Sequence, residues 1–116
     1  MYKALYLSPM IPSYEVVETA NFFQTLFGFD TVRQETGYII LIKDNLTIHI
    51  QNAGADIGGM SLYLAVDNID QLWKSIKDKL EGIKTRAPFD RDYGMREFHV
   101  IIPHTQTLMF VGQAIG

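Results

Sequence analysis

The amino-acid sequence predicts an α+β protein in which two βαβββ modules, residues 1–54 and 60–116, form one domain of 116 residues. Two observations lead to this prediction. The same order of elements, a strand, a helix ended by glycine, a strand and a hairpin, can be traced twice along the chain. In addition, 116 residues with a hydrophobic fraction of 47% suit a single globular domain that buries its own core.

The first module begins with a strand over residues 3–11, which Pro9 and Pro12 bend or interrupt. Apolar residues then recur at the spacing of a buried helical stripe, at Val16, Ala20, Phe23 and Phe27. Gly28 follows this stripe and can end the helix in a left-handed conformation. Three strands are expected next, at 29–34, 38–42 and 46–51.

The second module repeats this order after a Gly- and Ala-rich linker at 52–59. A strand at 61–66 precedes a helix that Asn68 caps and that Gly82 ends. The apolar stripe of this helix consists of Ile69, Leu72, Ile76 and Leu80. Further strands are expected at 83–88, 98–102 and 107–111. The second module carries about six additional residues between its helix and its hairpin, near 87–95.

Alternation along the strands separates an aliphatic face from a mixed face. The aliphatic face is expected to pack against the two helices and carries Leu46, Ile48, Ile50, Leu62, Leu64, Val66, Leu108 and Phe110. The mixed face carries Tyr6, Ser8, Thr47, His49, Gln51, Ser61, Tyr63, Thr107, Met109 and Val111. A solvated face is usually rich in lysine and glutamate, and the mixed face has neither. We therefore favour the wall of a small-molecule pocket over a solvated back face.

Composition excludes several classes of function. Ten Lys and Arg against thirteen Asp and Glu give a net charge of −3, without the basic excess of a nucleic-acid-binding protein. The chain has no cysteine, which excludes disulfides and thiolate metal sites. No apolar run reaches the roughly 20 residues of a membrane span. The N-terminus also lacks the apolar core of a signal peptide, so we expect a cytoplasmic protein with no membrane partner.

Two histidines are candidates for chemistry. His49 lies in the middle of a strand on the mixed face, where it can bind a metal, act as a general base or form a hydrogen bond in a pocket. Because no second metal ligand is apparent, we favour the hydrogen-bonded pocket residue. His99 is expected on the face opposite Phe98 and Val100, and its role stays open.

The additional residues of the second module include a charged segment at 90–97. One interpretation is a solvated loop with local ion pairs. The other is a lid beside the pocket, in which Tyr93 forms an aromatic wall and Arg91 or Arg96 meets a polar or anionic ligand group. The sequence supports both interpretations equally.

Several segments resemble the glyoxalase / bleomycin-resistance / extradiol-dioxygenase superfamily, the vicinal oxygen chelate proteins. They are SPMIP at 8–12, ANFFQTLFGF at 20–29, LAVDNID at 64–70, YGMREF at 93–98, IP at 102–103 and FVGQ at 110–113. The proline after the first strand and the Arg-Glu-Phe stretch are most similar to the bleomycin-resistance branch. The resemblance implies a curved mixed sheet, or half-barrel, with the helices on the outside, and it implies a homodimer.

Enzymes of this superfamily hold a divalent metal on the first, fourth, fifth and eighth strands. The resemblance places these positions at Ser8, His49, Ser61 and Met109. Only His49 is a competent ligand, whereas a divalent cation needs at least two or three nitrogen or oxygen ligands. We therefore expect a cleft without a metal or another cofactor.

The resemblance and the mixed face together predict a non-catalytic protein that binds a small organic molecule, either a drug or a metabolite. The expected ligand-binding residues are Tyr6, Ser8, His49, Ser61, Tyr63, Tyr93, Arg96 and Met109. The alternative is a lyase, isomerase or dioxygenase of the same superfamily, with a displaced metal site or metal-free acid–base chemistry at His49. A third interpretation is a structural or regulatory dimer without a ligand.

Overall fold

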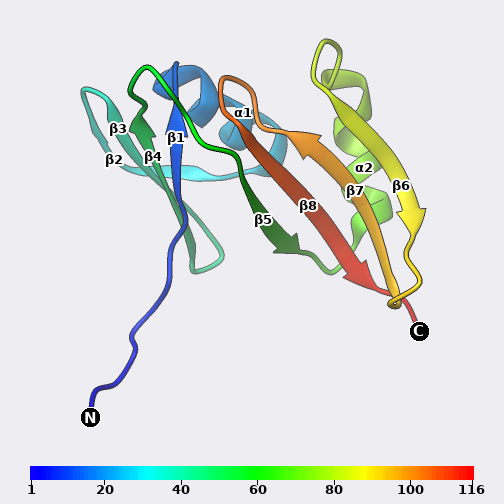
Figure 1. Ribbon diagram of the computed structural model, residues 1–116. Helices are drawn as coiled ribbons and strands as arrows, with labels where there is room; N and C mark the ends of the chain where they lie inside the picture. Colours follow the sequence, from blue (N-terminus) through cyan, green and yellow to red (C-terminus); the bar gives the residue numbers. More distant parts are fainter.

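The computed structural model describes all 116 residues as two βαβββ modules (Figure 1). The first module consists of β1 (Met10–Ser13), α1 (Val16–Phe27), β2 (Asp30–Glu35), β3 (Tyr38–Lys43) and β4 (Leu46–Asn52). The second consists of β5 (Met60–Ala65), α2 (Ile69–Ile76), β6 (Thr85–Asp90), β7 (Met95–Ile101) and β8 (Thr107–Ala114). The predicted α+β architecture is confirmed.

Each module forms its own four-stranded mixed sheet, with the strand orders β1-β4-β3-β2 and β5-β8-β7-β6. In both sheets the first and last strands of the module pair in parallel, and the other pairs are antiparallel. Helix α1 packs on the first sheet and α2 on the second (Figure 1). We call the side of each sheet that its helix leaves uncovered the open face. Neither helix is long and apolar enough to cross a membrane.

The predicted stripe of the first helix forms the core of the first module. All four of its residues are buried: Val16, Ala20, Phe23 and Phe27. The ring of Phe23 also meets that of Phe29 edge to face, with centroids 5.6 Å apart. Gly28 ends the helix at φ 72°, and its N–H donates to the carbonyl of Phe23. This left-handed conformation carries no steric cost for glycine, which explains why the helix ends there.

The second helix begins as predicted and ends earlier. The Asn68 side chain accepts a hydrogen bond from the N–H of Gln71 at 3.2 Å, which caps the first turn. The α-helix ends at Ile76, and a 3-10 turn, η1 (Lys77–Lys79), continues it. Trp73 anchors α2 to the sheet, because its ring lies 5.1 Å from that of Phe98 on β7.

The first strand is shorter than the predicted 3–11. Sheet pairing begins at Met10, opposite His49, and the preceding Pro9 carbonyl accepts from the N–H of His49 at 3.0 Å. Residues 1–9 extend from the body as an N-terminal arm (Figure 1). The alternation around Leu7 is typical of a strand, but no strand of the same chain lies beside the arm, and Leu7 is 97% exposed.

The predicted faces are correct for β4 and β5 and wrong for β8. The side chains of Thr107, Met109 and Val111 are fully buried on the helix side, although we expected them on the mixed face. The register of β8 on β7 is the cause, because it places Met109 opposite Val100 and Val111 opposite Phe98. Val100 and Phe98 are also fully buried. The open face of β8 is therefore formed by Leu108 and Phe110.

Candidate functional site

An apolar cavity of about 350 Å³ lies between the two modules, beside the N-terminal arm. The first module lines it with Tyr6, Leu7, Pro9, Phe29, Asn45, Leu46, Thr47 and Ile48. The second module contributes Leu62, Tyr63, Leu64 and Met109. We call this space the inter-module cavity. Its volume falls in the range of about 300–1,000 Å³ that small-molecule sites occupy.

The inter-module cavity brings together three of the eight residues predicted to bind a ligand, Tyr6, Tyr63 and Met109. Tyr6 reaches it from the arm and Tyr63 from the adjacent strand β5. Met109 has no exposed surface and lies beneath the wall that β5 forms, as its pairing with Leu62 requires. The cavity therefore lies at the junction of the modules. Its wall is not formed by the mixed face alone, because it also includes residues of the predicted aliphatic face, Leu46, Ile48, Leu62 and Leu64.

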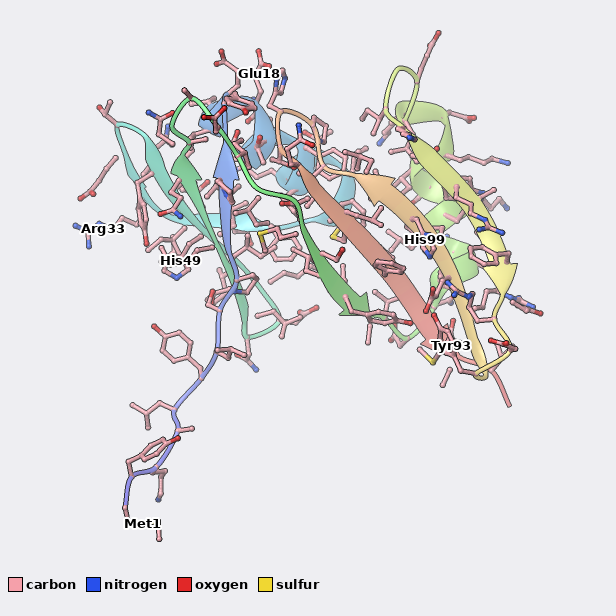
Figure 2. The ribbon with its side chains drawn as sticks, viewed as in Figure 1. Met1, Glu18, Arg33, His49, Tyr93 and His99 are labelled. Atoms are coloured by element: carbon pink, nitrogen blue, oxygen red, sulfur yellow. The ribbon has the colours of Figure 1, made fainter.

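Ser8 and His49 lie next to this cavity but do not line it. The Ser8 hydroxyl donates to the backbone carbonyl of Thr47 and accepts from the Thr47 hydroxyl, both at 2.8 Å. His49 is hydrogen-bonded through Nδ1 to the hydroxyl of Tyr38 on the neighbouring strand. Figure 2 shows His49 on the first sheet, away from His99 and Tyr93 on the second. The remaining predicted residue of β5, Ser61, is exposed and makes no side-chain hydrogen bond.

A buried carboxylate organises the open face of the second sheet. The Glu97 side chain has no exposed surface, and its Oε1 accepts from Arg91 Nη1 at 3.1 Å and from His99 Nε2 at 3.0 Å. Its Oε2 accepts from the hydroxyls of Tyr63, at 2.9 Å, and Tyr93. We call these five residues the Glu97 cluster. Four donors on one carboxylate satisfy it fully, as a buried charge requires.

The same contacts shift the pKa values of the cluster. Burial alone would raise the pKa of Glu97, but the hydrogen bonds from Tyr93, His99 and Tyr63 and the charge of Arg91 outweigh it and lower the pKa. Burial, followed by the hydrogen bond to Glu97, raises the pKa of Tyr63 to about 12. The hydrogen bond to Glu97 also raises the pKa of Tyr93. The carboxylate is therefore ionised and the phenols are neutral at physiological pH.

Gly112 provides the space for this cluster. A Cβ atom at position 112 would collide with the Tyr63 hydroxyl and come within 3.1 Å of Glu97 Cγ. Gly112 pairs with Glu97 across β7 and β8, directly below the Tyr63–Glu97 hydrogen bond. Only glycine at this point lets Tyr63 lie over β8 and reach the carboxylate.

The charged segment forms local contacts and does not border the inter-module cavity. Tyr93 lies over Glu97, as described above. Arg96 pairs with Asp90 at 2.7 Å and with Asp70 of α2 at 2.9 Å, on the opposite side of β7. Its hydrogen bond to Asp90 and the charges of Asp90 and Asp70 raise the pKa of Arg96. Of the two arginines considered for a ligand contact, only Arg91 lies on the open face.

No model of a protein family matches the sequence, and no curated protein sequence matches it significantly. Solved structures match along almost the whole chain. The bleomycin resistance determinant encoded on the transposon Tn5 has a TM-score of 0.79 at 24% identity, over 96% of this chain and 98% of that one. A bleomycin-binding protein from bleomycin-producing Streptomyces verticillus, solved with copper(II)-bleomycin, has a TM-score of 0.77 at 17% identity, over 100% of this chain and 99% of that one. Lactoylglutathione lyase from Agrobacterium tumefaciens has a TM-score of 0.77 at 10% identity, over 97% of this chain and 95% of that one.

The chain has the fold of the glyoxalase / bleomycin-resistance / dioxygenase superfamily. The resemblance inferred from the sequence segments is confirmed at the level of the fold. Because binding proteins and a lyase both occur among the neighbours of this superfamily fold, the fold does not by itself decide between binding and catalysis.

The positions that hold the metal in enzymes of the superfamily do not fit a divalent cation in this chain. His49 is the only nitrogen ligand, Ser8 is hydrogen-bonded to Thr47, and Met109 is fully buried in the core. No group of three or more His, Asp or Glu side chains that could hold a metal ion occurs in the structure. A hard cation needs more oxygen or nitrogen ligands than these positions supply.

The sequence interpretation missed the central residue of the second sheet, Glu97. It is the last residue of the charged segment at 90–97 and directly precedes the largely apolar run from Phe98 to Ile102. A glutamate inside a buried strand is rarely left unpaired, so it indicates a cluster of donors around it. That signal was available, and alternation along the strand places His99 on the same face as Glu97. The partner Tyr63 became identifiable only from the strand register.

Proposed function

We propose that this protein binds a small, largely apolar organic molecule, a drug or a metabolite, in the inter-module cavity and sequesters it without chemical change. The observation that carries the proposal is the composition of the cavity wall. Nine of its twelve residues are hydrophobic, and the other three are Pro9, Asn45 and Thr47, which add one amide and one hydroxyl group. Binding sites for small molecules commonly combine such an apolar wall with a few placed polar groups.

The wall also favours binding over acid–base catalysis. It contains no Asp, Glu, His, Lys or Arg side chain, so a ligand in the cavity meets no carboxylate or imidazole that can act as a general base. His49, the residue on which the enzymatic alternative depends, lies outside the wall and has its Nδ1 engaged by Tyr38. The bleomycin-binding proteins with the same fold offer a precedent for binding in this architecture.

We further propose that the protein is a homodimer in which the N-terminal arm packs on the second copy. The arm exposes Tyr2, Leu5, Tyr6 and Leu7 by 77–97% each. Apolar side chains that gather on one extended segment are typical of a segment that is buried in an assembly. Light scattering should show that deletion of residues 2–7 converts a dimer to a monomer. A dimer that survives the deletion would contradict an arm-mediated interface.

The sequestration proposal can be tested with a variant that fills the inter-module cavity. Leu46 lines the cavity and is 51% exposed, so Leu46→Trp adds bulk to the wall without burying a new ring in the core. Val32→Trp on the exposed strand β2 is the matched control, because Val32 is 58% exposed and lies outside the wall. Bleomycin and a panel of neutral aromatic compounds are suitable probes in a thermal-shift assay.

We expect at least one probe to raise the melting temperature of the wild type and of Val32→Trp, but not of Leu46→Trp. Mass spectrometry should recover that probe unchanged after prolonged incubation. If the shift persists in Leu46→Trp, the ligand binds elsewhere. A probe that is converted to a product would support the enzymatic alternative instead.

A further inference from the structure

A second hollow lies on the open face of the second sheet. It has a volume of about 250 Å³ and is lined by Lys84, Thr85, Arg86, His99, Ile101 and Leu108. None of these residues lines the inter-module cavity, so the two sites are separate. We call this space the β6–β8 hollow, because β6, β7 and β8 each contribute to it.

The walls of the β6–β8 hollow differ in chemical character from one side to the other. Lys84 and Arg86 stand at the outer edge, where β6 pairs with β7. Ile101 and Leu108 are cross-strand partners on β7 and β8 and form the apolar side. His99 lies between them, opposite Arg86 in the β6–β7 register. A molecule in this hollow therefore meets positive charge on one side and hydrocarbon on the other.

The two cations of the hollow lack acidic partners. Arg33, Arg91 and Arg96 each pair with a carboxylate, whereas Lys84 and Arg86 form no ion pair and no side-chain hydrogen bond. Arg86 is the one arginine of the four without a carboxylate partner, whereas Lys84 is unpaired like most lysines of the chain. Two unpaired cations next to each other repel one another and attract an anion.

Arg86 is also held in place over the sheet. Its guanidinium carbon lies 3.6 Å from the ring centroid of Phe89, a cation–π contact that keeps the charge over the open face. The Phe89 ring meets His99 edge to face at 5.2 Å. An arginine fixed in this way loses less conformational entropy on binding than a free surface side chain.

The acidic group that is hydrogen-bonded to the wall of the hollow does not neutralise it. Glu97 is hydrogen-bonded to His99, but its side chain is fully buried and its charge is paired with Arg91 at 3.1 Å. The second carboxylate oxygen of Glu97 accepts hydrogen bonds from the two tyrosine hydroxyls of the cluster. Glu97 therefore orients the His99 ring, through Nε2, as part of the wall, while Lys84 and Arg86 keep their charge available.

We propose that the β6–β8 hollow binds a small organic anion, with its carboxylate or phosphate between Lys84 and Arg86 and its hydrocarbon part on Ile101 and Leu108. The ligand class follows from the two halves of the wall, since neither a neutral hydrocarbon nor an inorganic anion satisfies both. This site does not depend on the function proposed for the inter-module cavity, because the two share no residue.

Calorimetric titration of the full chain at constant ionic strength tests this proposal. Benzoate and phenyl phosphate are the anionic probes, and benzyl alcohol and benzylammonium carry the same ring without a negative charge. We expect both anions to bind at least about tenfold more tightly than the neutral and cationic probes, a difference of about 1.4 kcal/mol. If benzoate binds more tightly than phenyl phosphate, the site is assigned to carboxylates. If phenyl phosphate binds more tightly, the site is assigned to phosphate esters.

The double variant Lys84→Gln/Arg86→Gln should weaken binding of the anions by about tenfold or more, which corresponds to about 1.4 kcal/mol. Lys77→Gln/Lys79→Gln removes the same charge from the exposed turn η1 and should bind as the wild type does. Leu46→Trp should also bind the anions normally, which separates this site from the inter-module cavity. Equal affinity for benzyl alcohol and benzoate, or equal losses in the two double variants, would overturn the proposal.

Discussion

Replacement of Glu97 by glutamine tests how much the Glu97 cluster contributes to stability. The substitution keeps the size of the side chain and removes its charge. The native carboxylate accepts four hydrogen bonds, from Arg91, His99, Tyr63 and Tyr93. A glutamine has one acceptor oxygen and an NH₂ group that needs acceptors of its own, so two of the four donors must rearrange.

The expected cost is smaller than the sum of four hydrogen bonds. A hydrogen bond to a charged group contributes about 1.5–3 kcal/mol. The tyrosine hydroxyls can rotate to accept from the new amide, and the Arg91 side chain is 30% exposed and can turn to water. We therefore expect a loss of about 2–3 kcal/mol at pH 7, close to one charged hydrogen bond. For a domain of this size, that loss lowers the melting temperature by about 6–12 °C.

Urea unfolding followed by circular dichroism at pH 7 and at pH 3 measures this effect. Because the pKa of Glu97 is lower in the folded state than the value of about 4.3 in an unfolded chain, its stabilisation is present at pH 7. The stabilisation is lost as the pH falls through the folded pKa, so the difference between wild type and Glu97→Gln should shrink at pH 3. Glu81→Gln, at an exposed position, is the control.

Two results would refute this reasoning. One is a Glu97→Gln variant within about 0.5 kcal/mol of the wild type at pH 7, the range of ordinary surface substitutions. The other is a difference between the two proteins that stays constant from pH 7 to pH 3, since it would show that the charge of Glu97 is not responsible.

Three further predictions concern single contacts. Asn68→Ala should lower the unfolding free energy by about 1 kcal/mol through loss of the helix cap, and a chemical-denaturation midpoint equal to the wild type would contradict this. Gly112→Ala should lower the unfolding free energy of the wild type more than that of the Tyr63→Ala variant, in which the colliding ring is absent. Equal losses of unfolding free energy in the two proteins would show that the collision does not matter. The raised pKa of Tyr63 stabilises the protein below about pH 10, and this contribution is lost as the pH rises toward about 12. Tyr63→Phe should therefore show a weaker loss of stability above pH 10 in alkaline unfolding curves, and a loss as steep as that of the wild type would exclude Tyr63 as its source.

The elements that could be predicted from sequence are those with local signals. The helical stripe from Val16 to Phe27 and the glycine that follows it depend only on spacing and on one backbone conformation. The Asn68 cap is local in the same sense. Because both modules carry these signals in the same order, the duplicated architecture followed from the sequence alone.

The features that could not be predicted depend on strand partners. Residues 107–111 of β8 alternate hardly at all in polarity, so only the pairing with β7 decides that Met109 faces the core and Phe110 the open face. In the same way, the residues around Leu7 alternate like a strand, yet a strand also needs a neighbour to accept its hydrogen bonds. The charge of Arg96 was evident, but its partner Asp70 follows from the position of α2 and its partner Asp90 from the register of β6 on β7.

The pairing of the first strand of the second module with its last has a consequence for biosynthesis. Strand β5 pairs only with β8, so about 40 residues of chain must leave the ribosome after β5 before its partner emerges. At about 5–20 residues per second, roughly two to eight seconds of translation pass while β5 has no neighbour. A nascent or truncated chain that stops before residue 107 therefore exposes an apolar strand edge, and such chains should depend on chaperones to remain in solution.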